Sequence, residues 1–182
     1  MSMARPREVL DFWFGAGPDK WFAKDEAFDA EIRRRFGAAH AAAAGGQFDG
    51  WMSEAPGALA LIIVLDQFSR NLHRGDHRAF MQDAMALARA EEAIDRRFDV
   101  EVPVTARKWF YMPFMHAEDL EAQRRGLEFF RHRLGDPETL RFAEEHADII
   151  ARFGRFPHRN AILGRVTSPQ EQAFLDSGGF AG

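Results

Sequence analysis

Three short segments of the chain combine charged, amide and imidazole side chains with aromatic ones, a mixture suited to ligand binding or proton transfer. They are LDQFSRN (Leu65–Asn71), WFYMPFMHAED (Trp109–Asp119) and HADIIARFGRFPHRN (His146–Asn160). Polar side chains of so many types are costly to bury unless they pair with one another or with a ligand. The three segments therefore predict either one shared pocket or an internal polar network.

The first segment directly follows the longest apolar run of the chain, Ala58–Leu65. In a helix, Asp66 and Arg70 are neighbours four residues apart. The same spacing joins Gln67 to Asn71. These side chains would project from a buried helix into polar surroundings that a ligand could occupy. The alternative is an ion pair and a hydrogen-bonded network at the end of the helix.

The second segment places His116 and Glu118 after a helix that contains Pro113 near its end. A histidine beside a carboxylate can act as a general acid or base, with the carboxylate orienting the imidazole. The pair is only a thin start on a metal site, because nothing else follows at ligand spacing. The alternative is local, since histidine favours the C-terminus of one helix and glutamate the N-terminus of the next.

The third segment carries Arg155 and Arg159 on a loop that Phe156-Pro157 should hold stiffly, with Asn160 behind them. Because a guanidinium group binds a carboxylate or phosphate through two parallel hydrogen bonds, the loop predicts an anion site. The alternative is that these arginines bind the protein's own carbonyls and carboxylates. His146, on an apolar helix face upstream, is expected in the core.

Helical periodicity predicts the elements that must position these segments. The expected helices cover residues 5–14, 25–44, 56–71, 76–97, 105–114 and 118–132, then 137 up to Gly154 and 169 up to Ser177. For the apolar run, a buried strand is the alternative, because three successive residues in it are β-branched. About seven or eight helices and no sheet make an all-α fold, the pattern that period-3.6 spacing indicates.

Local signals mark several boundaries of these helices. Asp136-Pro137 and the capping box Ser168–Glu171 are start signals, and Gly154 is a stop signal. Pro113 is expected to kink or end its helix. The segment Phe98–Pro103 is expected to be a loop, because Pro103 limits its alternating pattern.

Composition narrows the class of protein. The 182 residues fit a single domain, 1–182, with flexible ends at 1–4 and 177–182. The chain has no cysteine, so it can form no disulfide and do no thiolate chemistry. The net charge of −4 argues against a general nucleic-acid binder. We expect a soluble cytoplasmic protein, because no signal peptide is evident and the apolar run is far shorter than the ~20 residues of a membrane span.

No cofactor is expected, since the chain has neither a glycine-rich phosphate loop nor a dinucleotide signature. The expected partner is a small anionic molecule or a peptide, with no nucleic acid and no membrane. The aromatic start, FWF at Phe12–Phe14 with Trp21-Phe22, is interpreted as part of the core. The sequence leaves the oligomeric state open.

In this order and spacing, VLDFWFG, LDQFSRN, FYMPFMHAED and ARFGRFPHRN resemble a bacterial family catalogued as domain of unknown function 924, over about Val9–Phe174. The resemblance implies an all-helical fold of antiparallel pairs, similar to tetratricopeptide-like helical-hairpin arrays. It implies no established activity, substrate, cofactor or catalytic residue. The tetratricopeptide signature of Trp, Leu-Gly and Tyr is missing, so peptide binding by analogy of fold is weakly supported. The positions that match the family pattern are Asp66, Gln67, Arg70, Asn71, Tyr111, Pro113, His116, Glu118, Phe153, Gly154, Arg155, Phe156, Pro157, Arg159 and Asn160.

Three functional hypotheses follow. In the first, the segments meet in a pocket where arginines hold a small anion and His116 with Glu118 handles a proton. In the second, a helical-hairpin module binds a protein partner. In the third, the segments form a structural polar network. Whether the protein is an enzyme stays open. The candidate ligand-binding residues are Asp66, Gln67, Arg70, Asn71, His116, Glu118, Arg155, Arg159 and Asn160.

Overall fold

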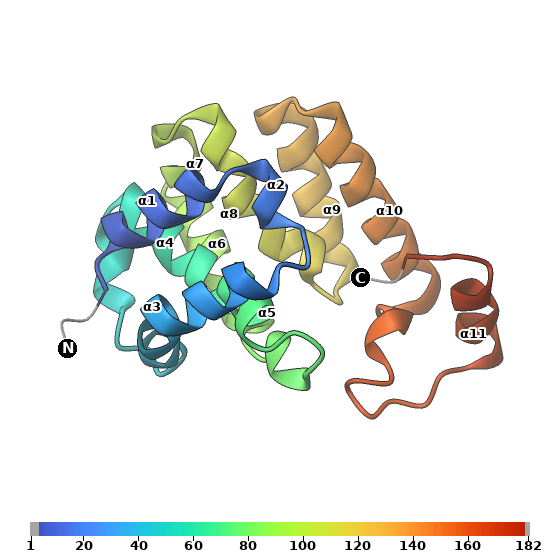
Figure 1. Ribbon diagram of the computed structural model, residues 1–182. Helices are drawn as coiled ribbons and strands as arrows, with labels where there is room; N and C mark the ends of the chain where they lie inside the picture. Colours follow the sequence, from blue (N-terminus) through green and yellow to red (C-terminus); the bar gives the residue numbers. More distant parts are fainter. Residues whose placement is uncertain (1–3, 181–182) are drawn as a thin grey trace.

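A computed structural model describes residues 4–180, and this part of the chain is helical and contains no strand (Figure 1). The all-α prediction is therefore confirmed. The helices are α1 (Pro6–Ala16), α2 (Pro18–Trp21), α3 (Glu26–Ala44), α4 (Ala55–Ile63), α5 (Ser69–Leu72), α6 (Asp83–Asp95), α7 (Phe98–Glu101), α8 (Val104–His116), α9 (Leu120–Phe129), α10 (Pro137–Phe153) and α11 (Pro169–Asp176). Short 3₁₀ turns are η1 (Asp49–Ser53), η3 (His77–Ala79) and η5 (Pro157–Arg159), and π-helical turns are η2 (Val64–Phe68) and η4 (Phe130–Leu134).

The helix boundaries with strong local signals lie where the sequence predicts them. Asp136 caps α10 by accepting a hydrogen bond from the backbone of Glu138, and Gly154 ends that helix with φ 68°. The Ser168 side chain and Glu171 form the predicted capping box of α11. These interactions join residues a few positions apart, so the sequence alone determines them.

Three boundaries differ from the prediction. The segment around Asp99 is a short helix, not a loop, because its buried carboxylate accepts bonds from Tyr111 and Arg133, which lie beyond the reach of local signals. Pro113 does not end α8, which continues to His116, because proline removes only one backbone hydrogen bond from a helix whose other side chains are buried there. Asp76 caps only the single turn η3, and α6 begins seven residues later, at Asp83.

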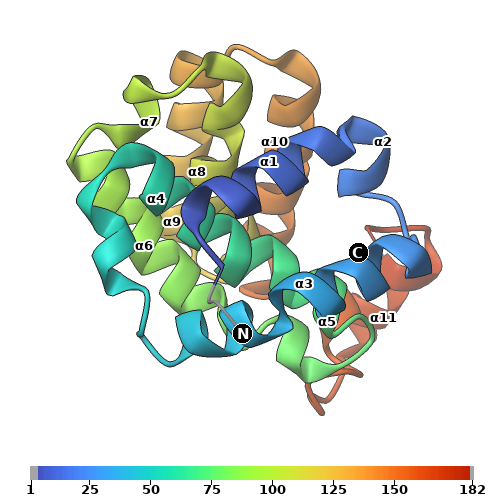
Figure 2. The same ribbon diagram turned by 60° about the vertical axis from the view of Figure 1, so that its left-hand side comes forward.

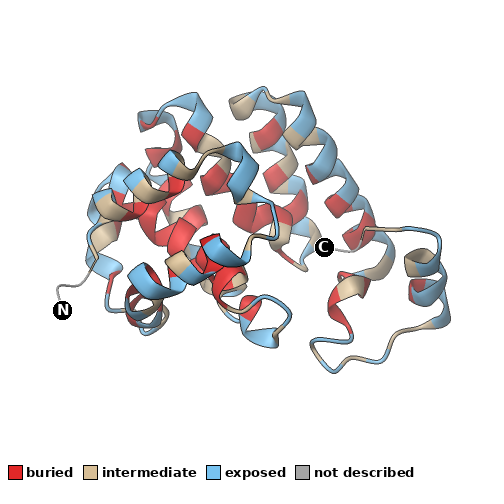
Figure 3. Ribbon diagram, in the orientation of Figure 1, coloured by how far each residue is buried: buried red, intermediate tan, exposed pale blue. Residues whose placement is uncertain are grey.

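The core surrounds α4. Eight of its nine residues are buried, which confirms a helix where a buried strand was the alternative. Aromatic rings from distant segments pack beside it, with the ring centroids of Trp13 and Trp109 5.0 Å apart. This confirms the core interpretation for Trp13, whereas it is wrong for Phe22, which is 62% exposed. Buried residues concentrate between α4 and α8 in Figure 3, while α8, α9 and α10 lie side by side in Figures 1 and 2.

A π-helical turn, η2, joins α4 to α5 and contains the start of the LDQFSRN segment. All five of its residues, Val64–Phe68, are buried. A π turn inserts an extra residue into an α-helix and is frequent at functional sites, because it reorients the side chains that follow. Here it carries Asp66, a carboxylate that is buried within the otherwise apolar interior.

A close approach between α4 and η1 makes Gly57 a sensitive position. A Cβ atom at Gly57 would lie 2.2 Å from the carbonyl oxygen of Trp51, so the backbone would have to shift. We expect Gly57→Ala to lower the free energy of unfolding by about 1–3 kcal/mol, as measured by urea denaturation. Gly37→Ala, in the middle of α3 with nothing within 4 Å, is the control and should be neutral or stabilising. Equal stability of the two variants would contradict the prediction.

The sequence predicts flexible segments at both ends of the chain. Of the segments expected to be flexible, residues 1–3 and 181–182 lie outside the described part. Phe180 packs its ring against His146, with centroids 4.5 Å apart, in a small apolar cluster beside α10. Within residues 4–180, no helix combines the length and the hydropathy required to cross a membrane.

Candidate functional site

A groove of about 410 Å³ opens beside α6, where the end of α8 and the residues before α9 meet η5. Residues of the second and third polar segments line the groove. The first segment, LDQFSRN, does not line it, but its Asp66 contacts His116 from behind. Its apolar lining comes from Phe80, Met81, Ala84, Leu87, Ala117 and Leu163. Its polar lining comes from His77, Asp83, His116, Glu118, Asp119 and Arg159.

The central contact of the site joins His116, the last residue of α8, to Asp66 in the π turn. Nδ1 of His116 lies 2.7 Å from Oδ1 of Asp66, whose side chain is only 1% exposed. Because an ionised carboxylate can only accept a hydrogen bond, Nδ1 carries the hydrogen and donates it. Nε2, on the other side of the ring, has no hydrogen-bond partner within residues 4–180, and His116 lines the groove.

The surroundings set the charges of this pair. Burial alone would raise the pKa of Asp66, but the positive charges of His116 in its protonated form and of Arg70 lower it, as do the hydrogen bonds from His116 and Gln67. Burial, followed by Arg70, lowers the pKa of His116 below its usual 6.5, and Asp66 offsets only part of that. At neutral pH the pair is therefore an ionised carboxylate and a neutral imidazole, whose Nε2 can accept a proton.

Asp83, at the start of α6, joins the two arginines nearest to the groove. Nη1 of Arg70 lies 2.9 Å from Oδ1 of Asp83, and Nη2 of Arg70 lies 3.1 Å from Oδ2 of Asp83. Nη1 of Arg159 lies 3.1 Å from Oδ2 of Asp83, and Nη2 donates to the backbone oxygen of His116 at 3.1 Å. Both guanidinium groups thus have internal carboxylate partners, and Arg159 also fixes the backbone that carries the imidazole.

Glu118 holds the loop after α10 and does not pair with His116. It accepts two hydrogen bonds from Arg165 and one, at 2.8 Å, from the backbone N–H of Phe156. Arg165 in turn donates to Oδ1 of Asn160 at 2.9 Å. The expected pair of His116 with Glu118 is therefore replaced by the pair of His116 with Asp66, which lies 50 residues away along the chain.

The other sequence candidates lie behind the groove or away from it. Gln67 donates to the carboxylate of Asp66. Asn71 donates to Asp29 on α3 at 2.8 Å. Arg155 makes a two-point ion pair with Glu171 on α11. The structure therefore brings His116, Glu118 and Arg159 to the groove, with Asp66 and Arg70 behind them, and leaves Asn71, Arg155 and Asn160 outside its lining.

Among the polar residues of the groove lining, His77 and two carboxylates were absent from the sequence candidates. Asp83 lies between the recognised segments, and its only signal is an acidic residue in the first turn of a helix, which occurs in many helices. Asp119 lines the groove, and its side chain caps α9 by accepting a hydrogen bond from Ala122. Both have ordinary roles at helix N-termini, so their sequence context alone does not distinguish them.

Arg155 is expected to serve the fold and not the groove. In Arg155→Ala, the Glu171 carboxylate, 4% exposed, loses its cationic partner. We expect a loss of about 1–3 kcal/mol in the free energy of unfolding, measured by urea denaturation. The control is Arg34→Ala, which removes an exposed pair with Glu31 and should cost less than about 1 kcal/mol. Unchanged stability of Arg155→Ala would refute the prediction.

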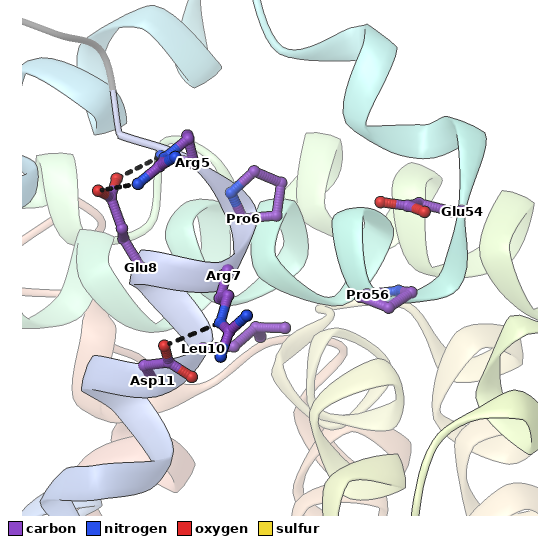
Figure 4. A pocket seen from close by; sticks show the side chains of 8 residues that line it. All are labelled: Arg5, Pro6, Arg7, Glu8, Leu10, Asp11, Glu54 and Pro56. Carbon is purple, nitrogen blue, oxygen red and sulfur yellow. Dashed lines mark hydrogen bonds and ion pairs between the residues drawn. The ribbon is translucent and has the colours of Figure 1, made fainter.

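A second hollow, of about 640 Å³, lies at the N-terminal end of α1 (Figure 4). Four of its five charged side chains pair within the same helical segment, Arg5 with Glu8 and Arg7 with Asp11, and the fifth, Glu54, is exposed. Exposed pairs of this kind are weak and offer no group that is buried and oriented toward a ligand. The groove with His116 is therefore the stronger candidate site.

The chemistry available in the groove is proton transfer and hydrogen bonding. Across residues 4–180, no three histidine, aspartate or glutamate side chains converge in a way that could hold a metal ion. The groove lining contains no hydroxyl or thiol side chain to act as a nucleophile. Nε2 of His116 is the one imidazole nitrogen there that a buried carboxylate orients.

One comparison with known proteins identifies a family. A family model described as a bacterial protein of unknown function, DUF924, matches residues 9–179. A solved structure of a protein of unknown function from Agrobacterium tumefaciens is 48% identical, with a TM-score of 0.91 over 95% of this chain and 97% of that one. The comparison with curated proteins found no match.

Proposed function

The chain belongs to the bacterial family DUF924, and we propose that its groove binds a small molecule from which His116, oriented by Asp66, accepts a proton. One observation supports this most: a buried carboxylate fixes Nδ1 of a neutral imidazole whose Nε2 has no hydrogen-bond partner among residues 4–180. The alternative from the sequence, a helical-hairpin interaction module of the tetratricopeptide type, stays a prediction.

The proton would move from a ligand hydroxyl or amine, or from a water molecule beside the ligand, to Nε2 of His116. The imidazolium formed would lie 2.7 Å from the carboxylate of Asp66, which stabilises its positive charge. Arg159 holds the backbone oxygen of His116 and so fixes the position of the ring. Since the groove lining has no hydroxyl or thiol side chain, the chemistry proposed is general-base catalysis at Nε2, without an intermediate on a serine, threonine or cysteine.

The proposal is tested by ligand binding to a matched pair of variants. His116→Gln keeps a polar side chain in the groove but cannot take up a proton at neutral pH. His77→Gln alters an exposed histidine of the same lining and serves as the control. We expect fragments that stabilise the wild type and His77→Gln to lose their effect on His116→Gln. At 100 times its dissociation constant, a fragment adds about 2.7 kcal/mol.

Protein-observed NMR gives the second readout, because the ¹⁵N shifts of an imidazole distinguish a protonated nitrogen from a bare one. We expect Nε2 of His116 to be unprotonated at pH 7 and to shift when a fragment binds. Fragments that bind equally well to both variants, or an Nε2 that carries the hydrogen, would argue against the proposal.

A structural polar network is the second candidate, and one observation favours it. Three of the four arginines in the motifs, Arg70, Arg155 and Arg159, have an internal carboxylate partner. If the network has only this role, His116→Gln should lower stability and change no ligand response.

A further inference from the structure

We infer that the ligand of the groove is a neutral or cationic hydrogen-bond donor, an alcohol or amine on an apolar body, and not a carboxylate or phosphate. This inference rests on the proposed function and specifies the substrate class. It reverses the expectation of an anion that the arginine-rich segments suggest from sequence. Three observations carry it: the charge balance, the direction of the hydrogen bonds and the apolar lining.

Each arginine at the groove is bound by an internal carboxylate, although the buried Nε of Arg159 has no hydrogen-bond partner within residues 4–180. Arg70 and Arg159 share the carboxylate of Asp83, and Arg165 is bound by both oxygens of Glu118. The guanidinium of Arg159 also lies between two rings, 4.4 Å from the centroid of Phe80 and 4.5 Å from that of Phe156.

The sum of charges is negative. Four carboxylates, Asp66, Asp83, Glu118 and Asp119, face three guanidinium groups, Arg70, Arg159 and Arg165, which gives 3 − 4 = −1 with His116 neutral. His77, at the groove, lies 3.3 Å from the carboxylate of Asp76, but Arg78 also pairs with that carboxylate at 2.9 Å, so the two residues leave the sum unchanged. An anionic ligand would therefore have to displace an internal carboxylate from its arginine, whereas a cation meets an excess of negative charge.

The hydrogen-bonding groups point to the same class. Nδ1 of His116 gives its hydrogen to Asp66, so Nε2 can only accept. Oδ1 of Asp119 already accepts from the backbone of Ala122, but a carboxylate oxygen has room for a further donor. The groove thus presents acceptors where a ligand head would lie. A carboxylate or phosphate, which offers acceptors of its own, would leave them unmatched.

The apolar lining defines the rest of the molecule. Phe80, Met81, Ala84, Leu87 and Leu163 supply carbon surface around the polar group. Met81 is 61% exposed, and burying an exposed methionine under a ligand is favourable because apolar surface leaves water. A small hydrocarbon body therefore fits beside Nε2, because a groove of about 410 Å³ lies within the size range of small-ligand sites.

The test uses three probes with one carbon skeleton: cyclohexylmethanol, cyclohexylmethylamine and cyclohexanecarboxylate. Binding to the full chain is followed at pH 7.5 by the ¹⁵N shift of Nε2 in His116 and the methyl shift of Met81. We expect the alcohol and the amine to move both signals, and the carboxylate to bind at least about tenfold more weakly, because like charges meet.

Asp119→Asn separates charge from shape, since asparagine caps a helix as well as aspartate does. In this variant we expect cyclohexylmethylamine to bind more weakly and cyclohexylmethanol to keep its affinity. If cyclohexanecarboxylate moved the His116 and Met81 signals and bound more tightly than the alcohol and the amine, the inference would be overturned and the proposed groove would stand. If none of the probes moves the Nε2 signal, the inference and the proposed function fail together.

Discussion

Asp66→Ala is expected to lower the free energy of unfolding by about 3–5 kcal/mol, among the largest effects of any single substitution in this protein. The carboxylate is 1% exposed and binds His116 and Arg70 together. Removing the carboxylate leaves a cavity. Arg70, which is partly buried, then keeps only one of its two carboxylate partners, and Nδ1–H of His116 loses its hydrogen-bond acceptor. The loss is measured by urea denaturation at pH 7.

Asp66→Asn is the matched variant, because it keeps the shape and an acceptor oxygen but removes the charge. We expect it to be clearly more stable than Asp66→Ala, since Arg70 retains Asp83. It should also lower the pKa of His116 further, because the neighbouring negative charge opposes that lowering in the wild type. If Asp66→Ala is as stable as the wild type, the contact between Asp66 and His116 is not formed in solution.

Acid is expected to destabilise the protein between pH 6.5 and about 4, before most carboxylates are protonated. Burial lowers the pKa of His40, His146 and His158 from 6.5 to about 4, assisted by His73, His116 and Arg159, respectively. In that range the unfolded chain binds more protons than the folded one. The contribution of these three neutral histidines to the free energy of unfolding is therefore complete above pH 6.5, and it is lost as the pH falls toward 4.

The size of the acid effect follows from proton uptake. Each histidine that stays neutral only in the folded state adds a slope of up to about 1.4 kcal/mol per pH unit. Urea midpoints at pH 7, 6 and 5 measure the combined slope. His146→Gln, which removes one of the three groups, should flatten the curve. A free energy of unfolding that stays constant from pH 7 to 5 would show that these rings are protonated in the folded protein.

The parts of the fold that the sequence predicts are those that neighbouring residues determine. Asp136 and Gly154 bound α10 through contacts within one helical turn. The short helix around Asp99 escaped prediction because its stabilising partners, Tyr111 and Arg133, belong to α8 and η4. Propensity and spacing cannot reveal a carboxylate whose partners come from other elements.

The same distinction explains the candidate site. The sequence identifies His116, Asp66 and Arg159 as unusual, because polar residues in apolar surroundings require partners. It does not identify which partners they have, since spacing along the chain favoured Glu118 over Asp66 for the imidazole. Asp83, which links two arginines, resembles any acidic residue at the start of a helix.

The π turn at Val64–Phe68 has a consequence for how this protein could change over generations. The helix there holds one residue more than an ideal α-helical ladder accommodates. A one-residue deletion would give a more regular helix, yet it would rotate Asp66 away from His116 by about 100°, the angle of one α-helical residue. A more regular helix would therefore lose the contact between Asp66 and His116, so engineering for stability should leave this turn unaltered.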